Sequence, residues 1–158
     1  MTETNTAQSE QVARDFVAWE NGDDSKIDVV SESLDMYNPG LPNGEAHHRE
    51  EVAAYLYESR AAFPDAAFLI EEIVADDNVI LAELTVRGTH QGEFKGIPPT
   101  GRRVEFGAMA RYVVADGKVE ECHVYYDTKT LANQLGLTFP TVLGQLPKLI
   151  LRKLKAKL

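Results

Sequence analysis

The chain has 158 residues, 44% of them hydrophobic, and a formal charge of −9. These values fit a single domain with one core, and no internal repeat is visible. The acidic balance argues against nucleic-acid binding, which requires basic groups that neutralise phosphates. Cys122 is the only cysteine, which excludes an internal disulfide, and no apolar run approaches the roughly 20 residues that span a bilayer. The first ten residues do not resemble a signal peptide, so we expect a cytoplasmic protein.

Helical spacing of apolar residues predicts three helices before Pro64. Residues 7–20 form an amphipathic pattern that stops at Gly22. A second, shorter helix is predicted from residue 25 to 34, because Ser25 and Asp28 have the spacing of a capping box. Residues 34–37 favour a short strand, and the Asn-, Pro- and Gly-rich segment 38–44 is a loop. The third helix spans residues 48–63.

The apolar period changes to two after Pro64, which predicts strands at 67–75, 79–88, 103–115 and 118–127. Short turn segments join the first and the last pair of strands. The segment 88–106 contains four glycines and two adjacent prolines, so neither a helix nor a paired strand continues through its middle. It is predicted to be a long, shaped hairpin loop. Helices followed by an antiparallel meander indicate an α+β domain.

The end of the chain is basic. Residues 128–137 predict a short helix or turn, and residues 147–158 predict a last helix with Pro147 at its first position. Residues 138–158 hold five of the 16 basic residues and no acid, which leaves 11 basic against 25 acidic residues elsewhere, a charge near −14. We expect 138–158 to be a basic amphipathic extension of the domain formed by 1–137. It packs on its own domain or a partner subunit, or it contacts a membrane surface or another partner.

Three polar side chains share one face of the last predicted strand. A period of two places His123, Tyr125 and Asp127 on the same side, with neighbours about 7 Å apart. This face is either exposed or lines a cavity, and the alternate face is no more apolar. In a cavity, burial would raise the pKa of Asp127 and make it a usable general acid or base. Otherwise Asp127 caps the helix that follows.

The turn at Asp116-Gly117 decides which residues of the preceding strand face this ladder. A two-residue turn pairs Ala110 with His123 and leaves room for a ligand above small side chains. A three-residue turn brings Arg111 and Met109 to these places instead, and Arg111 then offers a cation to an anionic or enolate substrate. The sequence leaves both registers open.

The other histidines carry no recognisable site. His47 and His48 precede a helix without a third ligand at metal-binding spacing, so no metal site is predicted. His90 lies at the mouth of the long loop, where we expect its ring to bond to loop backbone rather than to act in catalysis. Motifs for a nucleophilic serine, a phosphate-binding loop and a dinucleotide site are absent from the sequence.

Several short motifs occur in a recognisable order. They are Ala62-Phe63-Pro64-Asp65, the loop segment 88–102, Asp116-Gly117-Lys118-Val119, and Asp127 followed by Leu135-Gly136-Leu137. Together they resemble the SnoaL-like polyketide cyclases over residues 10–137. The resemblance implies the cone-shaped α+β barrel of the nuclear-transport-factor-2-like superfold, with three N-terminal helices packed on a curved, mainly antiparallel sheet. It also implies a homodimer and no cofactor.

The resemblance carries a catalytic expectation. In the cyclases of this family an aspartate on the last strand acts as acid and base in an intramolecular aldol closure, and Asp127 matches that position. Three positions depart from the family's pattern: His123 replaces a common Trp, Val113 replaces a basic or His partner, and Tyr37 replaces a common His. We therefore predict that His123 assists Asp127 from a new position.

The sequence thus predicts a cofactor-independent cyclase, isomerase or lyase that acts on a hydrophobic, oxygenated small molecule, with Asp127 and His123 catalytic. The alternative is a non-catalytic ligand-binding or dimeric interaction module in which Asp127 only caps a helix. The predicted pocket lining consists of Tyr125, Arg111, Met109, Tyr37, Asn38, Trp19 and Tyr55.

Overall fold

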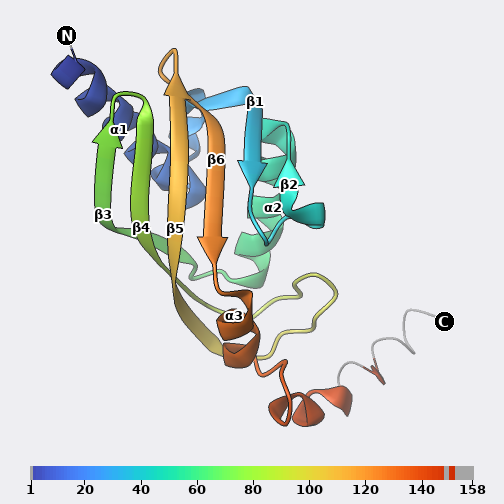
Figure 1. Ribbon diagram of the computed structural model, residues 1–158. Coiled ribbons are helices and arrows are strands. Elements are labelled where there is room, and N and C mark those ends of the chain that lie inside the picture. The colour runs from blue at the N-terminus through green and yellow to red at the C-terminus, as the bar shows by residue number, and fades with distance from the viewer. Residues whose placement is uncertain (1, 148–149, 152–158) are drawn as a thin grey trace.

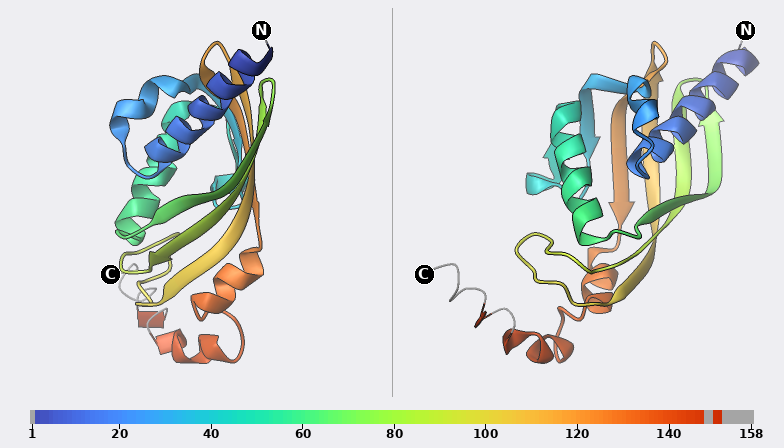
Figure 2. Two further views of the ribbon diagram at one scale, coloured as in Figure 1. Left: turned by 90° about the vertical axis from the view of Figure 1, so that its left-hand side faces the viewer. Right: turned by 180° about the vertical axis from the view of Figure 1, so that it is seen from behind.

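The computed structural model describes residues 2–147 and 150–151. A six-stranded mixed sheet, in the order β2-β1-β6-β5-β4-β3, curves without closing into a full barrel (Figure 1). Helices α1 (Thr2–Glu20) and α2 (Arg49–Ala62) lie together on its concave side (Figure 2). The predicted α+β architecture is therefore confirmed.

The sheet contains the four strands predicted after Pro64 and two before it, and the short strand predicted at residues 34–37 is part of the first of these two. The four after Pro64 are β3 (Ala67–Asp76), β4 (Val79–Thr89), β5 (Arg103–Ala115) and β6 (Lys118–Tyr126). They form an antiparallel meander. The edge is extended by β1 (Val30–Tyr37), which pairs in parallel with β6, and by the short β2 (Glu45–Ala46). Helix α3 (Thr128–Gln134) and the 3-10 turns η2 (Pro42–Gly44) and η3 (Thr141–Gly144) complete the described elements.

The prediction of a second helix over residues 25–34 is wrong. This segment contains only the 3-10 turn η1 (Asp24–Val29), and β1 follows at once. The Asp23 carboxylate accepts the Ser25 backbone N–H, so Asp23 caps the turn in place of the predicted capping box. Ile27 is 40% exposed, and the β-branched pair Val29-Val30 favours the extended chain. The apolar residues of this segment have helical spacing, but they belong to a short turn and to the strand that follows it.

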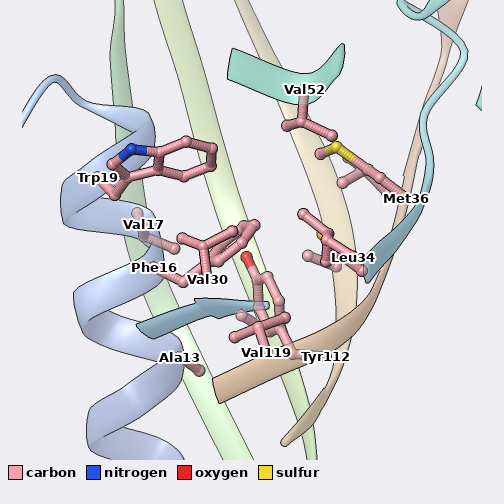
Figure 3. Packing of buried hydrophobic residues seen from close by; sticks show 14 of the residues in the cluster. Ala13, Phe16, Val17, Trp19, Val30, Leu34, Met36, Val52, Tyr112 and Val119 are labelled. Carbon is pink, nitrogen blue, oxygen red and sulfur yellow. The ribbon is translucent and has the colours of Figure 1, made fainter. Parts of the chain in front are cut away.

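The hydrophobic core fills the space between α1, α2 and the concave face of the sheet (Figure 3). Phe16 and Trp19 of α1 lie with their ring centroids 5.6 Å apart, and Phe16 contacts Tyr112 of β5 at the same separation. Trp19 is 3% exposed and belongs to this core. Its prediction as a pocket-lining residue is wrong, because the indole packs against helix and strand side chains.

A β-bulge decides the register of the last hairpin. Asp116 and Gly117 have positive φ values of 49° and 74° and form a two-residue turn. The pairing then shifts, because β6 contains one extra residue, Glu120, opposite β5. The first register predicted the correct turn, yet the observed pairs are those of the second register: Arg111 with His123 and Met109 with Tyr125.

The long loop between β4 and β5 is present as predicted, and it is fastened to the end of α2. The backbone N–H groups of Gln91 and Gly92 both donate to the Ala62 carbonyl at 2.9 Å. The Thr100 backbone N–H donates to Nδ1 of His90 at 3.3 Å, which confirms the expected bond between this ring and loop backbone. The loop therefore lies below the end of α2 and beside α3 (Figure 1).

The predicted last helix lies mostly outside the described residues. Residues 148–149 and 152–158, with all five basic side chains of the extension, belong to that part of the chain, whereas 146–147 and 150–151 are helical. The roles expected for this helix stay predictions. Among the described residues, no helix combines the length and the hydropathy needed to cross a membrane.

Candidate functional site

A pocket of about 100 Å³ lies between the C-terminal half of α2, the lower part of the concave face, the long loop and α3. Its wall is mostly apolar, with polar side chains grouped toward the ends of α1 and α2. The lining residues are Glu20, Asn38, Tyr55, Leu56, Ser59, Arg60, Phe63, Ala66, Phe68, Leu84, Val86, Arg87, Gly88, Phe94, Val104, Phe106, Ala108, Val124, Tyr126 and Leu131. Such a site suits a small, largely apolar ligand with a few polar atoms.

Glu20 is the one carboxylic acid among the described residues that line this pocket. It ends α1 and is 5% exposed. Burial raises the pKa of Glu20 to about 8, although the nearby Arg60 cation opposes the shift. Within the described part of the chain, no hydrogen bond ends on its carboxyl oxygens. A carboxyl that changes protonation near neutral pH and has no fixed partner is suited to general acid–base work.

Arg60 holds the end of α1 in place. Its Nη2 donates to the backbone carbonyls of Trp19 at 2.6 Å and of Glu20 at 3.1 Å. The Trp19 carbonyl also accepts the Gly22 backbone N–H at 2.9 Å, so Arg60 and this turn together cap α1 and fix where the Glu20 side chain starts. Because Arg60 is used in this way, its charge favours the ionised form of Glu20 without forming an ion pair with it.

Two elements build the wall beside Glu20. Tyr55 of α2 packs over the loop after β1, where a Cβ atom on Gly40 would lie 2.1 Å from the Tyr55 hydroxyl oxygen. Asn38 of the same loop accepts the Gly40 backbone N–H at 2.8 Å through Oδ1. Only glycine at position 40 leaves room for this hydroxyl. The loop and the helix thus fix Tyr55 at the pocket wall.

Tyr126 and the long loop form the opposite wall. Tyr126, at the end of β6, packs on Phe106 with a ring separation of 5.1 Å, and burial raises the pKa of its hydroxyl. Phe94 reaches the pocket from the loop and meets Phe63 edge to face at 5.6 Å. The His90 ring stacks on the same Phe63 ring, with the centroids 5.0 Å apart. The loop is therefore a wall of the site as well as a connection between strands.

The structure divides the predicted site residues into two groups. Asn38 and Tyr55 line the pocket. His123, Tyr125, Tyr37, Arg111 and Met109 lie on the outer, convex face of the sheet, away from it. There Tyr37 lies 6.1 Å from His123 and 5.7 Å from Tyr125, ring to ring, and Arg111 pairs with Glu121 at 3.0 Å.

The bulge at Glu120 explains why the ladder lies outside. An uninterrupted period of two would put Val119 on the same face as His123. The extra residue instead joins Val119 to Cys122 and Val124 on the buried face. Of the two alternatives for this face, the structure shows the exposed one for this reason, and Tyr125 is 53% exposed.

Asp127 has the geometry of a helix cap. Its Oδ1 accepts the Lys129 backbone N–H at 2.9 Å and its Oδ2 accepts the Thr130 hydroxyl at 2.7 Å, at the start of α3. The Thr130 hydrogen bond holds the pKa of this exposed carboxyl below its usual range. A base near neutral pH requires the opposite shift. These contacts support the alternative in which Asp127 caps a helix, and the function proposed below does not use Asp127 or His123 in catalysis.

Sequence reasoning missed Glu20, Ser59, Arg60 and Tyr126. A signal for Glu20 was present, since it lies four residues after Phe16 and three after Val17 on the buried stripe of α1. A charged residue on an apolar stripe marks a buried acid. Tyr126 could be found only by placing the bulge. Among the described residues, no three His, Cys, Asp or Glu side chains are grouped closely enough to hold a metal ion.

Comparison with known proteins agrees with the fold and with the family resemblance of the sequence. Residues 11–135 match the sequence pattern of the SnoaL-like polyketide cyclases. Aklanonic acid methyl ester cyclase DnrD of Streptomyces peucetius is 32% identical over 148 residues, covering 90% of this chain and 99% of that protein. DauD of Streptomyces sp. (strain C5), a cyclase of the same name, is 32% identical over 146 residues, covering 89% of this chain and 88% of that protein.

Solved structures show the same fold. AclR of Streptomyces galilaeus, a proposed hydroxylase, superimposes with a TM-score of 0.71 at 28% identity, covering 84% of this chain and 98% of that one. IdmH of Streptomyces antibioticus, a proposed polyketide cyclase, gives a TM-score of 0.71 at 27% identity, covering 82% and 99%. With the family pattern matched over most of its length, the chain belongs to the SnoaL-like polyketide cyclase family.

Proposed function

We propose that the protein is a cofactor-independent cyclase that closes a ring within a hydrophobic, oxygenated small molecule by acid–base chemistry, with Glu20 as the acid and base. The observation that carries this proposal is a buried, unpartnered carboxyl with a pKa of about 8 in an apolar pocket. Two relatives are named for the cyclisation of aklanonic acid methyl ester, which supports a polyketide ester as the substrate class.

The chemistry requires only groups on this chain. The Glu20 carboxylate removes a proton from the carbon beside a carbonyl, and the electron pair of that C–H bond moves toward the carbonyl oxygen to give an enolate. The enolate carbon attacks a second carbonyl of the same molecule, so a C–C bond forms and the first C=O is restored. The second oxygen takes the proton back from the Glu20 carboxylic acid. The product is an isomer of the substrate, and the carboxyl is regenerated.

The first half of this sequence can be measured without knowing the natural substrate. We expect the protein to exchange the protons beside the carbonyl of 1-tetralone for deuterium in D₂O, followed by ¹H NMR. Glu20→Gln keeps the size of the side chain and removes the base, so exchange should fall by about 100-fold or more. Exchange at the wild-type rate in a folded Glu20→Gln variant would contradict the proposal.

Two further expectations belong to this proposal. The protein acts in the cytoplasm as a homodimer, and the exposed apolar side chains on the outer face of the sheet support this assembly. They are Tyr37, Val74, Leu81, Met109 and Tyr125, one from each of five neighbouring strands.

A further inference from the structure

The polar end of the pocket contains hydrogen-bond donors that have no partner in the described part of the chain. Tyr55 and Ser59 lie one turn apart on α2 and line the pocket together. The buried Ser59 hydroxyl has no partner at hydrogen-bonding geometry in the described part of the chain, nor has Nε of Arg60. Even if the Tyr55 and Ser59 hydroxyls bond to each other, a pair of hydroxyls uses one proton internally and keeps one to donate.

Tyr126 adds a further donor from the opposite wall. Tyr55 and Tyr126 line the same pocket, and no hydrogen bond from the Tyr126 hydroxyl is found among the described residues. On the acceptor side, Oδ1 of Asn38 already receives the Gly40 N–H. That oxygen can accept one more hydrogen bond, whereas Glu20 is protonated below a pH of about 8 and then brings a further donor. The two buried donors without a partner, Oγ of Ser59 and Nε of Arg60, are costly, so this end of the pocket is complementary to a ligand that brings acceptor oxygens.

We propose that the Tyr55 and Tyr126 hydroxyls, which we call the tyrosine pair, bind the carbonyl oxygen of the substrate and the enolate oxygen that forms from it. The inference rests on the proposed function for the chemical step. It adds the hydrogen-bond donors for the substrate oxygen, which the Glu20 carboxylate does not supply. As the C–H electron pair moves to the oxygen, hydrogen bonds to that oxygen strengthen, which lowers the barrier to proton removal.

The tyrosine pair also specifies a class of ligand. The apolar walls accept a ring system, while the donors select a ketone over a hydrocarbon of equal size. Because both hydroxyls have a pKa raised by burial, they stay protonated across the physiological range and remain donors. The preferred ligand is therefore an aromatic or alicyclic ketone with an enolisable carbon.

The test compares 1-tetralone with tetralin, which has the same two rings without the oxygen. Isothermal titration at pH 6.5 should show wild-type protein binding 1-tetralone about tenfold more tightly than tetralin. Tyr55→Phe and Tyr126→Phe should each weaken 1-tetralone binding by about 2- to 13-fold, the range for one neutral hydrogen bond, and leave tetralin binding unchanged. Tyr57→Phe is the matched control, because Tyr57 lies on the same helix and is 76% exposed.

Two further measurements separate binding from packing. The carbonyl stretch of bound ¹³C-labelled 1-tetralone should move to lower frequency in wild-type protein and return in the double Tyr→Phe variant. Gly40→Ala keeps both tyrosines but places a Cβ against the Tyr55 hydroxyl, so it should reproduce the effect of Tyr55→Phe. A ketone preference that survives in the double variant, an unshifted carbonyl band, or no binding of 1-tetralone to folded wild-type protein would each overturn the inference.

These outcomes are distinguishable from a failure of the proposed function. Glu20→Gln should lose deuterium exchange at pH 8.5, where the wild-type carboxyl is largely ionised, while it keeps the preference for 1-tetralone over tetralin at pH 6.5. Exchange that depends on Glu20, without any ketone preference, would refute the role of the tyrosine pair and leave the proposed function intact. A ketone preference without Glu20-dependent exchange would remove the proposed function alone.

Discussion

Glu20 shows how a single residue position is set by competing effects. Its place on the buried stripe of α1 takes the carboxyl out of water, which favours the protonated form. The neighbouring Arg60 works in the opposite direction but is held by the helix-end carbonyls. Desolvation is the larger effect, and the carboxyl titrates near pH 8 instead of near 4.5. Burying this carboxyl costs free energy that an apolar side chain at position 20 would not cost, so packing alone does not explain an acid here.

This shift makes stability depend on pH. Since the folded state holds the Glu20 proton more tightly than the unfolded chain, the unfolded chain alone loses it as pH rises from about 4.5 to about 8. Stability should therefore fall over this window, by up to about 1.4 kcal/mol per pH unit from this group. Urea unfolding at several pH values should show this slope in wild-type protein and a flatter one in Glu20→Gln.

The control for this prediction is Glu58→Gln, which removes an exposed carboxyl from α2. Its unfolding free energy should follow the wild-type pH dependence. Equal slopes in wild-type protein and Glu20→Gln would show that Glu20 is not held protonated in the folded state.

At the scale of elements, patterns of apolar residues were enough to predict α1, α2 and the four strands of the meander. They failed where a local feature outside the pattern decided the outcome. The helix predicted over residues 25–34 is a turn and a strand, because the β-branched pair Val29-Val30 favours the extended chain. The bulge at Glu120 reverses which side chains of β6 face the core. A period-two argument carried across an unseen bulge assigns every later side chain to the wrong face.

The long loop shows the opposite case, because its composition predicted its character correctly. Gly92 approaches α2 so closely that a Cβ atom would lie 2.3 Å from the Ala61 carbonyl oxygen. Gly92→Ala should therefore push the loop, with Phe94, away from the pocket. We expect a loss of about 1–3 kcal/mol in the free energy of unfolding, measured with urea.

Gly107→Ala is the matched control for this element. Gly107 lies in β5, and no atom lies within 4 Å of the place that an added Cβ would take, so this substitution should change stability little. A Gly92→Ala variant as stable as wild-type protein would mean that the loop is not fastened to α2.

For the whole molecule, the resemblance predicted the superfold, and the family match confirms it. The pocket's chemistry was not predictable in the same way, because Glu20, Tyr55 and Tyr126 come from α1, α2 and β6 and meet only in the folded sheet. The sequence placed His123 and Tyr125 correctly next to one another. It could not show that the bulge at Glu120 turns them away from the helices.

The outer face of the sheet leads to a prediction about assembly. Light scattering after size exclusion should give twice the 17.5 kDa mass of one chain. The double variant Leu81→Glu, Met109→Glu places charges on two exposed apolar positions of neighbouring strands and should give the mass of a single chain. Tyr57→Glu, on an exposed position of α2, should leave the assembly unchanged. A monomeric wild-type protein would refute the homodimer.

The rate of deuterium exchange into 1-tetralone, compared between two carboxyl variants, tests the central claim most directly. Asp127→Asn removes the charge but keeps an oxygen that can cap α3, and Glu20→Gln removes the pocket carboxyl. We expect wild-type exchange in Asp127→Asn and a loss of about 100-fold or more in Glu20→Gln. The reverse result, with exchange lost in Asp127→Asn and kept in Glu20→Gln, would contradict the assignment of the pocket as the active site.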